Sequence, residues 1–149
     1  MSLDTEIYVN NILSIKINKS RSILYVNITK YFDHDEKMLI ESIDNFKAVW
    51  YYTMNNNLKY HLHIIIDSSN KNTTSLPITS IINFINVLSE LNPVFDKCLH
   101  STCVTLKDKS WEDSVKLILN LYKPSRPLKI TEDEDEINKF FHCNKIVEK

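Results

Sequence analysis

The chain of 149 residues contains no glycine and a single alanine, Ala48. Average usage of about 7% would give roughly ten glycines at this length. Loops that cradle phosphates and the sharp turn that carries a nucleophilic serine need glycine, because their backbones adopt positive φ or approach a ligand closely. The sequence therefore excludes a Walker A loop, a dinucleotide-binding fingerprint and a G-x-S-x-G nucleophile elbow.

Isoleucine, lysine and asparagine are abundant instead, and their AT-rich codons indicate an AT-rich genome, such as that of a protist or a large DNA virus. Asparagine is the best remaining residue for left-handed backbone positions. We therefore expect asparagines to shape the turns, namely Asn18, Asn55 to Asn57, Asn70 and Asn92.

The overall composition indicates one globular domain, and the lack of signal-peptide and transmembrane patterns leads us to expect it in the cytoplasm. Hydrophobic residues make up 43% and charged residues 25% of the chain, which suffices for one buried core. The 18 basic and 19 acidic residues nearly cancel, which disfavours nucleic-acid binding. We expect no signal peptide, no transmembrane segment and three free thiols, at Cys98, Cys103 and Cys143.

The first half of the chain predicts a hairpin, a helix and a buried strand. Leu13–Ile17 alternates in polarity with a period of two, and a short polar turn separates it from the largely apolar Ile23–Ile28. The two stretches predict an antiparallel hairpin. Helical spacing predicts a helix over about 34–54. Tyr60–Asp67 is nearly continuous in apolar character, as in the central strand of a parallel sheet. Trp50, Tyr51 and Tyr52 in this helix are consecutive, so at least one should be exposed.

The second half alternates helices with short strands. A helix is expected from Pro77 to about Asn92–Pro93, and the next from about Ser110 to Lys123. The expected strands are Thr102–Leu106 and Leu128–Ile130, before a last helix that the acidic run 132–136 favours through the helix dipole. The predicted order is ββαβαβαβα. We expect a single α/β domain over 1–149: a mainly parallel sheet of four to five strands, an N-terminal antiparallel hairpin and about four helices.

This element order resembles the fold of STAS domains (sulfate transporters and anti-sigma-factor antagonists) over residues 12–142. The stretches that carry the likeness are HIIID, SLPITSIINFINVLSEL and LKITEDEDEINKFF. The resemblance implies a regulatory, non-enzymatic module that binds a protein partner. Bacterial members have a phosphorylated D-S-S-G or D-S-T-G turn at the helix start, where this chain has Thr74–Pro77.

Ligands of open α/β sheets bind beyond the carboxyl ends of the strands. The leading hypothesis therefore places the partner surface in the 68–80 loop and at the start of the second helix. The residues assigned to that surface are Asp67, Ser68, Ser69, Ser75 and Leu76.

The chain is also similar to CRAL-TRIO lipid-transfer domains through the stretches CVTL, SWEDSVKLILNLYKPSRP and LKI. This likeness implies an alternative function, the carriage of a lipid or other apolar ligand between the second and third helices. The residues assigned to that pocket are Ile82, Phe84, Trp111, Val115 and Leu119.

A third hypothesis is an enzyme with a site scattered over strand ends. His61 and His63 stand two apart on a strand and share a face, where they could bind a metal or move protons. Cys98-x-His100-x-x-Cys103 with His142-Cys143 offers zinc-type ligands, but its spacing matches no strong signature. Arg126 could clamp an anion. We assign no catalytic residue, metal ligand or cofactor, and a homodimer is a further possibility.

Overall fold

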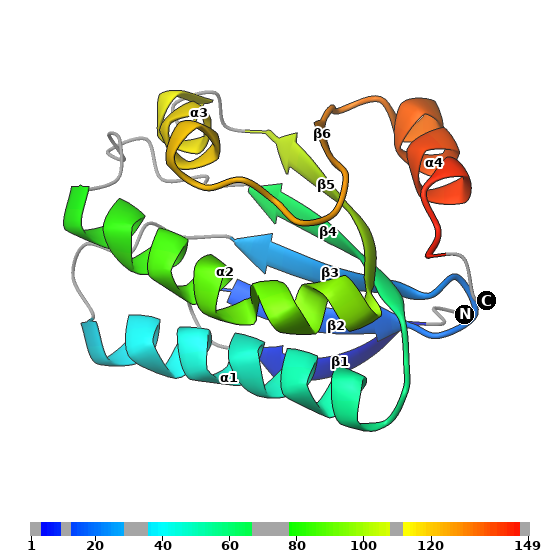
Figure 1. The fold of residues 1–149 in the computed structure, drawn as a ribbon, viewed down its shortest axis with the longest axis horizontal. Helices are drawn as coiled ribbons and strands as arrows, with labels where there is room; N and C mark the ends of the chain where they lie inside the picture. Colours follow the sequence, from blue (N-terminus) through cyan, green and yellow to red (C-terminus); the bar gives the residue numbers. More distant parts are fainter. Residues whose placement is uncertain (1–3, 10–12, 29–35, 67–77, 108–111, 147–149) are drawn as a thin grey trace.

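The computed structural model describes residues 4–9, 13–28, 36–66, 78–107 and 112–146. These form a six-stranded sheet and four helices (Figure 1). In chain order, the elements are β1 (Asp4–Val9), β2 (Leu13–Asn18), β3 (Ile23–Ile28), α1 (Glu36–Asn55), β4 (Tyr60–Ile66), α2 (Ile78–Cys98), β5 (Leu99–Leu106), α3 (Glu112–Leu121), β6 (Leu128–Ile130) and α4 (Glu134–Cys143).

The strands lie in sequence order across the sheet, from β1 to β6. β1, β2 and β3 pair antiparallel, whereas β3, β4, β5 and β6 pair parallel. This confirms the α/β class, the N-terminal hairpin and the mainly parallel sheet. None of the described helices is long and apolar enough to span a bilayer.

The side chains of alternate strand residues enter two separate apolar layers. One layer packs between the sheet and helices α1, α2 and α3, with Ile15, Leu24, Leu62 and Val104 at its base. The other lies on the opposite face, where Ile137 and Phe141 of α4 cover Ile23 and Cys103. Figure 1 shows α1 and α2 side by side across the sheet, with α4 set apart from them.

The predicted strand count was too low, because β1 was missed. A register shift between Glu6 and Tyr8 interrupts the alternation of this strand, and Ile7 and Val9 are exposed at the sheet edge. Only Tyr8 of residues 5–9 is partly covered, and a bulged edge strand exposed on both faces lacks the period of two that identifies a half-buried strand. The observed order is therefore βββαβαβαβα.

Helix α2 does not end at Asn92–Pro93, as predicted, but continues to Cys98 with Pro93 inside it. A proline inside a helix costs about 3 kcal/mol, because it lacks an N–H group and crowds the preceding turn. Val94, Phe95 and Cys98 are buried beyond it. Full burial of a large apolar side chain stabilises the fold by about 1.5–3 kcal/mol. The burial of these three side chains together therefore outweighs the cost of the proline. β5 consequently begins at Leu99, three residues before the predicted start.

The turns use polar residues where glycine is common. Asn57, after α1, has φ 56°, as expected of an asparagine in a turn. In the β2–β3 turn the positive φ of 56° belongs to Ser22 instead. Asn18 contributes there through its side chain, whose Oδ1 accepts hydrogen bonds from Ser20 Oγ at 2.8 Å and Arg21 N at 3.0 Å. Asn92 lies inside α2 and shapes no turn.

The other boundaries agree closely with expectation. α1 covers 36–55 against the predicted 34–54, and β6 has the predicted bounds. Asp133 caps α4, because its side chain accepts from the backbone N–H groups of Asp135 and Glu136. Trp50 is fully buried whereas Tyr51 and Tyr52 are exposed, which confirms the expectation for that aromatic run.

The course of α2 beyond Pro93 can be tested by truncating Phe95, which is 2% exposed and packs edge-on against Trp50. We expect Phe95→Ala to lower the free energy of unfolding by about 3–5 kcal/mol in urea titrations. Ile82→Ala, an exposed position of the same helix, should change it by less than about 0.5 kcal/mol. If α2 ended at Asn92 and left Phe95 in a surface turn, Phe95→Ala and Ile82→Ala would change the free energy of unfolding by similarly small amounts. That result would contradict the observed course of α2.

Candidate functional site

The carboxyl ends of the parallel strands meet at one edge of the sheet. Ile66, which ends β4, pairs in register with Ile28 at the end of β3 on one side and with Leu106 at the end of β5 on the other. The backbone N–H of Lys107 donates to Ile66 O at 2.9 Å and continues the pairing past the end of β5. The residues assigned to partner binding, Asp67, Ser68, Ser69, Ser75 and Leu76, lie outside the described residues.

Two isoleucines are exposed in the helices that begin at this edge, Ile40 by 58% and Ile82 by 48%. α1 and α2 run in the same direction (Figure 1), and Lys47 Nζ lies 2.8 Å from Glu90 Oε2 between them. About two turns before this pair come Ile40 on α1 and Asn83 on α2. Ile40 and Ile82 therefore lie at the same end of the helix pair. Ile40 was not predicted to be part of a site. The one signal in the sequence is that this residue is apolar although it lies outside the buried face of the α1 helix.

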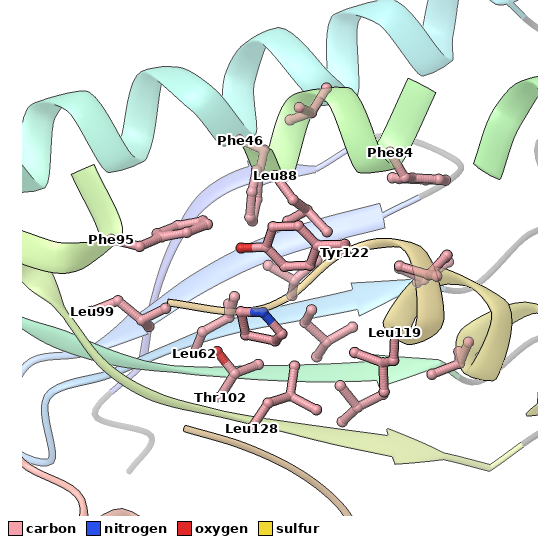
Figure 2. Close-up of a pocket in the computed structure, with 18 of the residues that line it drawn as sticks. Phe46, Leu62, Phe84, Leu88, Phe95, Leu99, Thr102, Leu119, Tyr122 and Leu128 are labelled. Carbon is pink, nitrogen blue, oxygen red and sulfur yellow. The ribbon is translucent and has the colours of Figure 1, made fainter. Parts of the chain in front are cut away.

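A cavity of about 170 Å³ lies between the helix layer and the sheet. Figure 2 shows Phe46, Phe84 and Leu88 on its helix side, with Leu62 and Leu128 on its sheet side. Of the residues assigned to an apolar pocket, Phe84, Val115 and Leu119 line it. Ile82 does not, because it points to solvent on the outer side of α2, and Trp111 lies outside the described residues. Most of the wall comes from strands and from α1, which the prediction did not include.

The segment that leaves α3 contributes part of the wall of the cavity. Tyr122 is buried and stands between the helix and sheet layers in Figure 2. Its hydroxyl donates to Asn92 Oδ1, and burial, with a smaller contribution from Asp96, raises the pKa of Tyr122 to about 12. Arg126 also lines the cavity, and its Nε donates to the backbone oxygens of Leu99 at 3.1 Å and His100 at 3.4 Å.

His61 and His63 share a face of β4, as predicted, and that face is covered by α4. The ring of His61 stacks on Phe141 with centroids 4.5 Å apart, and its Nδ1 lies 2.7 Å from Ser101 Oγ. His63 Nε2 lies 2.9 Å from Thr105 Oγ1. Because the Thr105 hydroxyl donates its one hydrogen to Thr131 O, it must accept from His63, whose proton is therefore on Nε2.

The environment of these rings favours the neutral imidazole. Burial lowers the pKa of His61 to about 3, and the nearby His100 and Lys145 add to the effect. Burial likewise lowers the pKa of His63 to about 4, with contributions from Arg21 and Lys107. Two neutral, hydrogen-bonded rings under a helix serve packing, and neither faces the apolar cavity on the other side of the sheet.

The potential zinc ligands are not brought together. Cys98 packs in the layer under α1 and α2, whereas Cys103 belongs to the layer under α4. No group of three histidine, cysteine or acidic side chains suited to a metal occurs among the described residues. Cys98 donates to Val94 O at 3.2 Å, and burial raises the pKa of both buried thiols to about 11. A thiol with a raised pKa is a poor nucleophile, which argues against Cys98 with His100 as a catalytic pair.

Comparison with known proteins shows that the chain is similar in fold to solved structures. No protein family model matches the chain, and no curated protein matches its sequence. Among solved structures, apo-SiaC from Pseudomonas aeruginosa is similar with a TM-score of 0.56 and 12% identity, covering 88% of this chain and 99% of that one. A second structure of SiaC from the same organism gives 0.55 and 13%, over 88% and 98%.

The fold is STAS-like. Sequence identity this low shows the architecture alone, so the site must be argued from the residues of this chain. Two places in this STAS-like fold are candidates for a functional site. One is the carboxyl edge with Ile40 and Ile82, and the other is the apolar cavity between the helices and the sheet.

The neutral state of His61 and His63 predicts acid sensitivity. Both pKa values are lowered on folding from about 6.5, so the stability gained from the neutral rings is complete above pH 6.5. It is lost as pH falls towards 4, because the unfolded chain then binds two more protons than the folded one. We expect each histidine to contribute about 1 kcal/mol per pH unit to the unfolding free energy in this window.

The measurement is urea unfolding at pH 7.5, 6.0 and 5.0. His61→Phe retains a ring against Phe141 and should flatten the pH dependence between 7.5 and 5.0, whatever its effect on stability at pH 7.5. His142→Gln, at an exposed position of α4, should leave the dependence unchanged. The prediction would be contradicted if the unfolding free energy of His61→Phe and that of the unaltered protein changed equally with pH.

Proposed function

We propose that the chain is a non-enzymatic, regulatory protein-interaction module that acts in the cytoplasm and binds its partner at the carboxyl edge of the sheet. The observation that carries the proposal is the exposed pair Ile40 and Ile82 at the start of α1 and α2. Exposed apolar side chains beside the edge where α/β proteins bind ligands can anchor a protein partner. The proposed surface also includes Asp67, Ser68, Ser69, Ser75 and Leu76.

Three further observations support the proposal. The STAS-like fold is compatible with a protein-binding role. His61 and His63 are held in structural hydrogen bonds, and burial raises the pKa of the Cys98 and Cys103 thiols. The candidate bases and nucleophiles of the sequence therefore have roles in packing.

The double variant Ile40→Glu with Ile82→Glu tests the surface, because a carboxylate cannot enter an apolar contact without losing its hydration. In parallel affinity purifications with quantitative mass spectrometry, specific partners should fall about tenfold or more. Tyr52→Glu is the matched control: Tyr52 is 63% exposed near the opposite end of α1, and its replacement should leave binding unchanged.

A second comparison uses Ser69→Ala, Ser75→Ala and Leu76→Ala together, which should remove the same partners as the double isoleucine variant. If every variant recovers the same partners in the same amounts, the carboxyl edge is not the binding surface. Light scattering of the purified protein identifies the case in which the partner is a second copy of the chain. The dimer should then dissociate in the isoleucine variant.

A second candidate function is the carriage of a small apolar ligand, and the cavity under α2 and α3 is the observation that favours it. Native mass spectrometry after mild purification should show an added mass that organic solvent releases. Recovery of the bare chain mass alone, with no extractable compound, would exclude a ligand that persists through purification.

A further inference from the structure

We propose that an open hollow at the amino edge of the sheet, where β3, β4 and β5 begin, binds a small organic phosphate that carries two or three negative charges. The hollow has a volume of about 470 Å³. It is separate from the proposed partner surface, which lies at the opposite edge of the sheet, and from the apolar cavity under the helices.

Four segments that are distant in the sequence meet at this hollow. They are the β2–β3 turn, the α1–β4 turn, the start of β5 and the segment after α4, which reaches this edge in Figure 1. The residues that line the hollow are Lys19, Ser22, 57–60, His100, Lys145 and Ile146.

Backbone hydrogen bonds hold these segments against one another. The N–H of His61 donates to Ser22 O at 2.7 Å and joins β4 to the β2–β3 turn. The N–H of Ile146 donates to His100 Nδ1 at 2.8 Å and joins the C-terminal segment to β5. Ser22 and Asn57 are the residues with positive φ in the described part of the chain, and both line the hollow. Such backbone conformations concentrate at ligand sites, where the surrounding structure holds them in place.

The wall of the hollow carries a concentration of positive charge. Lys19, Lys59 and Lys145 line it, and no acidic side chain does so among the described residues. The whole chain has a net charge of −1, so this excess is local. Neither Lys19 nor Lys145 forms an ion pair with an acidic side chain of the described residues. A hollow with charges of one sign raises the local concentration of the opposite ion, so this one attracts anions.

The type of cation favours phosphate over carboxylate. Arginine pairs with a carboxylate through two parallel hydrogen bonds from its planar fork, and no arginine lines the hollow among the described residues. Lysine is a compact charge with three rotatable donors, and it binds the oxygens of a phosphate group as a point charge. Three lysines therefore suit a ligand with two or three charges on phosphate oxygens.

The size and the apolar part of the wall indicate that the ligand is more than an inorganic phosphate. A volume of about 470 Å³ falls within the roughly 300–1,000 Å³ of pockets for small molecules. Leu58, Tyr60 and Ile146 add apolar surface beside the lysines. The ligand class that fits both features combines phosphate groups with a small organic part.

The test uses the full chain in a buffer without magnesium and four probes: adenosine diphosphate, adenosine, pyrophosphate and citrate. Calorimetry measures the affinity, and the backbone amide NMR signals of Ser22, Asn57 and His100 report the place of binding. Adenosine diphosphate should bind about tenfold or more tightly than adenosine, which has no charge to pair with the lysines. It should also bind more tightly than pyrophosphate, which lacks an organic part. Citrate, whose charges are all on carboxylates, should bind less tightly than pyrophosphate.

Charge removal at the wall tests the role of the lysines. Lys19→Gln with Lys145→Gln should weaken adenosine diphosphate about tenfold and leave adenosine unchanged. The matched control, Lys37→Gln with Lys107→Gln, also removes two charges, but from exposed positions at the opposite edge of the sheet. It should change the affinity by less than about twofold, because charges farther apart than about 10 Å are largely screened at about 0.1 M salt.

The proposed site is wrong if the wall variant and the control variant bind adenosine diphosphate alike, or if the amide signals of the wall do not shift. Equal binding of pyrophosphate and citrate would overturn the preference for phosphate. Equal binding of pyrophosphate and adenosine diphosphate would overturn the organic part of the ligand class. Binding of adenosine diphosphate that is the tightest of the four and depends on Lys19 and Lys145 supports the proposal.

Discussion

Strand β4 is buried on both faces, and the rest of the structure depends on how its two sets of side chains are accommodated. Leu62, Ile64 and Ile66 enter the layer under α1 and α2. Because these side chains are apolar, they need no hydrogen-bond partner when they are buried. His61 and His63 enter the layer under α4, where each buried ring nitrogen without a hydrogen bond would cost about 1–3 kcal/mol. The hydroxyls of Ser101 and Thr105 on the neighbouring strand supply those bonds.

This arrangement also holds the C-terminal helix. α4 is amphipathic and short, so its stability comes from packing and capping. Phe141 stacks on the neutral ring of His61, and the Asp133 side chain accepts the first free N–H groups of the helix. Arg21 Nη2 donates to Asn138 Oδ1 at 2.6 Å and joins α4 to the β2–β3 turn. The helix therefore buries two histidines whose burial favours the neutral ring.

Local signals made much of the fold predictable, and the candidate site less so. The alternation in β2, the apolar runs of β3 and β4 and the acidic cap of α4 each depend on residues close in sequence. The length of α2 was not predictable, because burial beyond Pro93 overrides a local helix breaker. The cavity was predicted only in part, since its wall extends from Leu13 to Leu128 and depends on how distant elements pack. Of the residues assigned to a pocket between α2 and α3, Phe84, Val115 and Leu119 line the cavity, whose sheet side the sequence did not indicate.

The cavity is not explained by small side chains, because neither glycine nor alanine lines it. Large side chains surround it, and Tyr122 stands between the two layers with its hydroxyl held by Asn92. Side chains that line an unfilled volume lack contact partners on one side and lose the dispersion attraction that close packing provides. A ligand that binds the folded chain at about 100 times its dissociation constant contributes about 2.7 kcal/mol of stability. The same packing that shapes the cavity therefore also sets how much stability an apolar ligand could add to the folded chain.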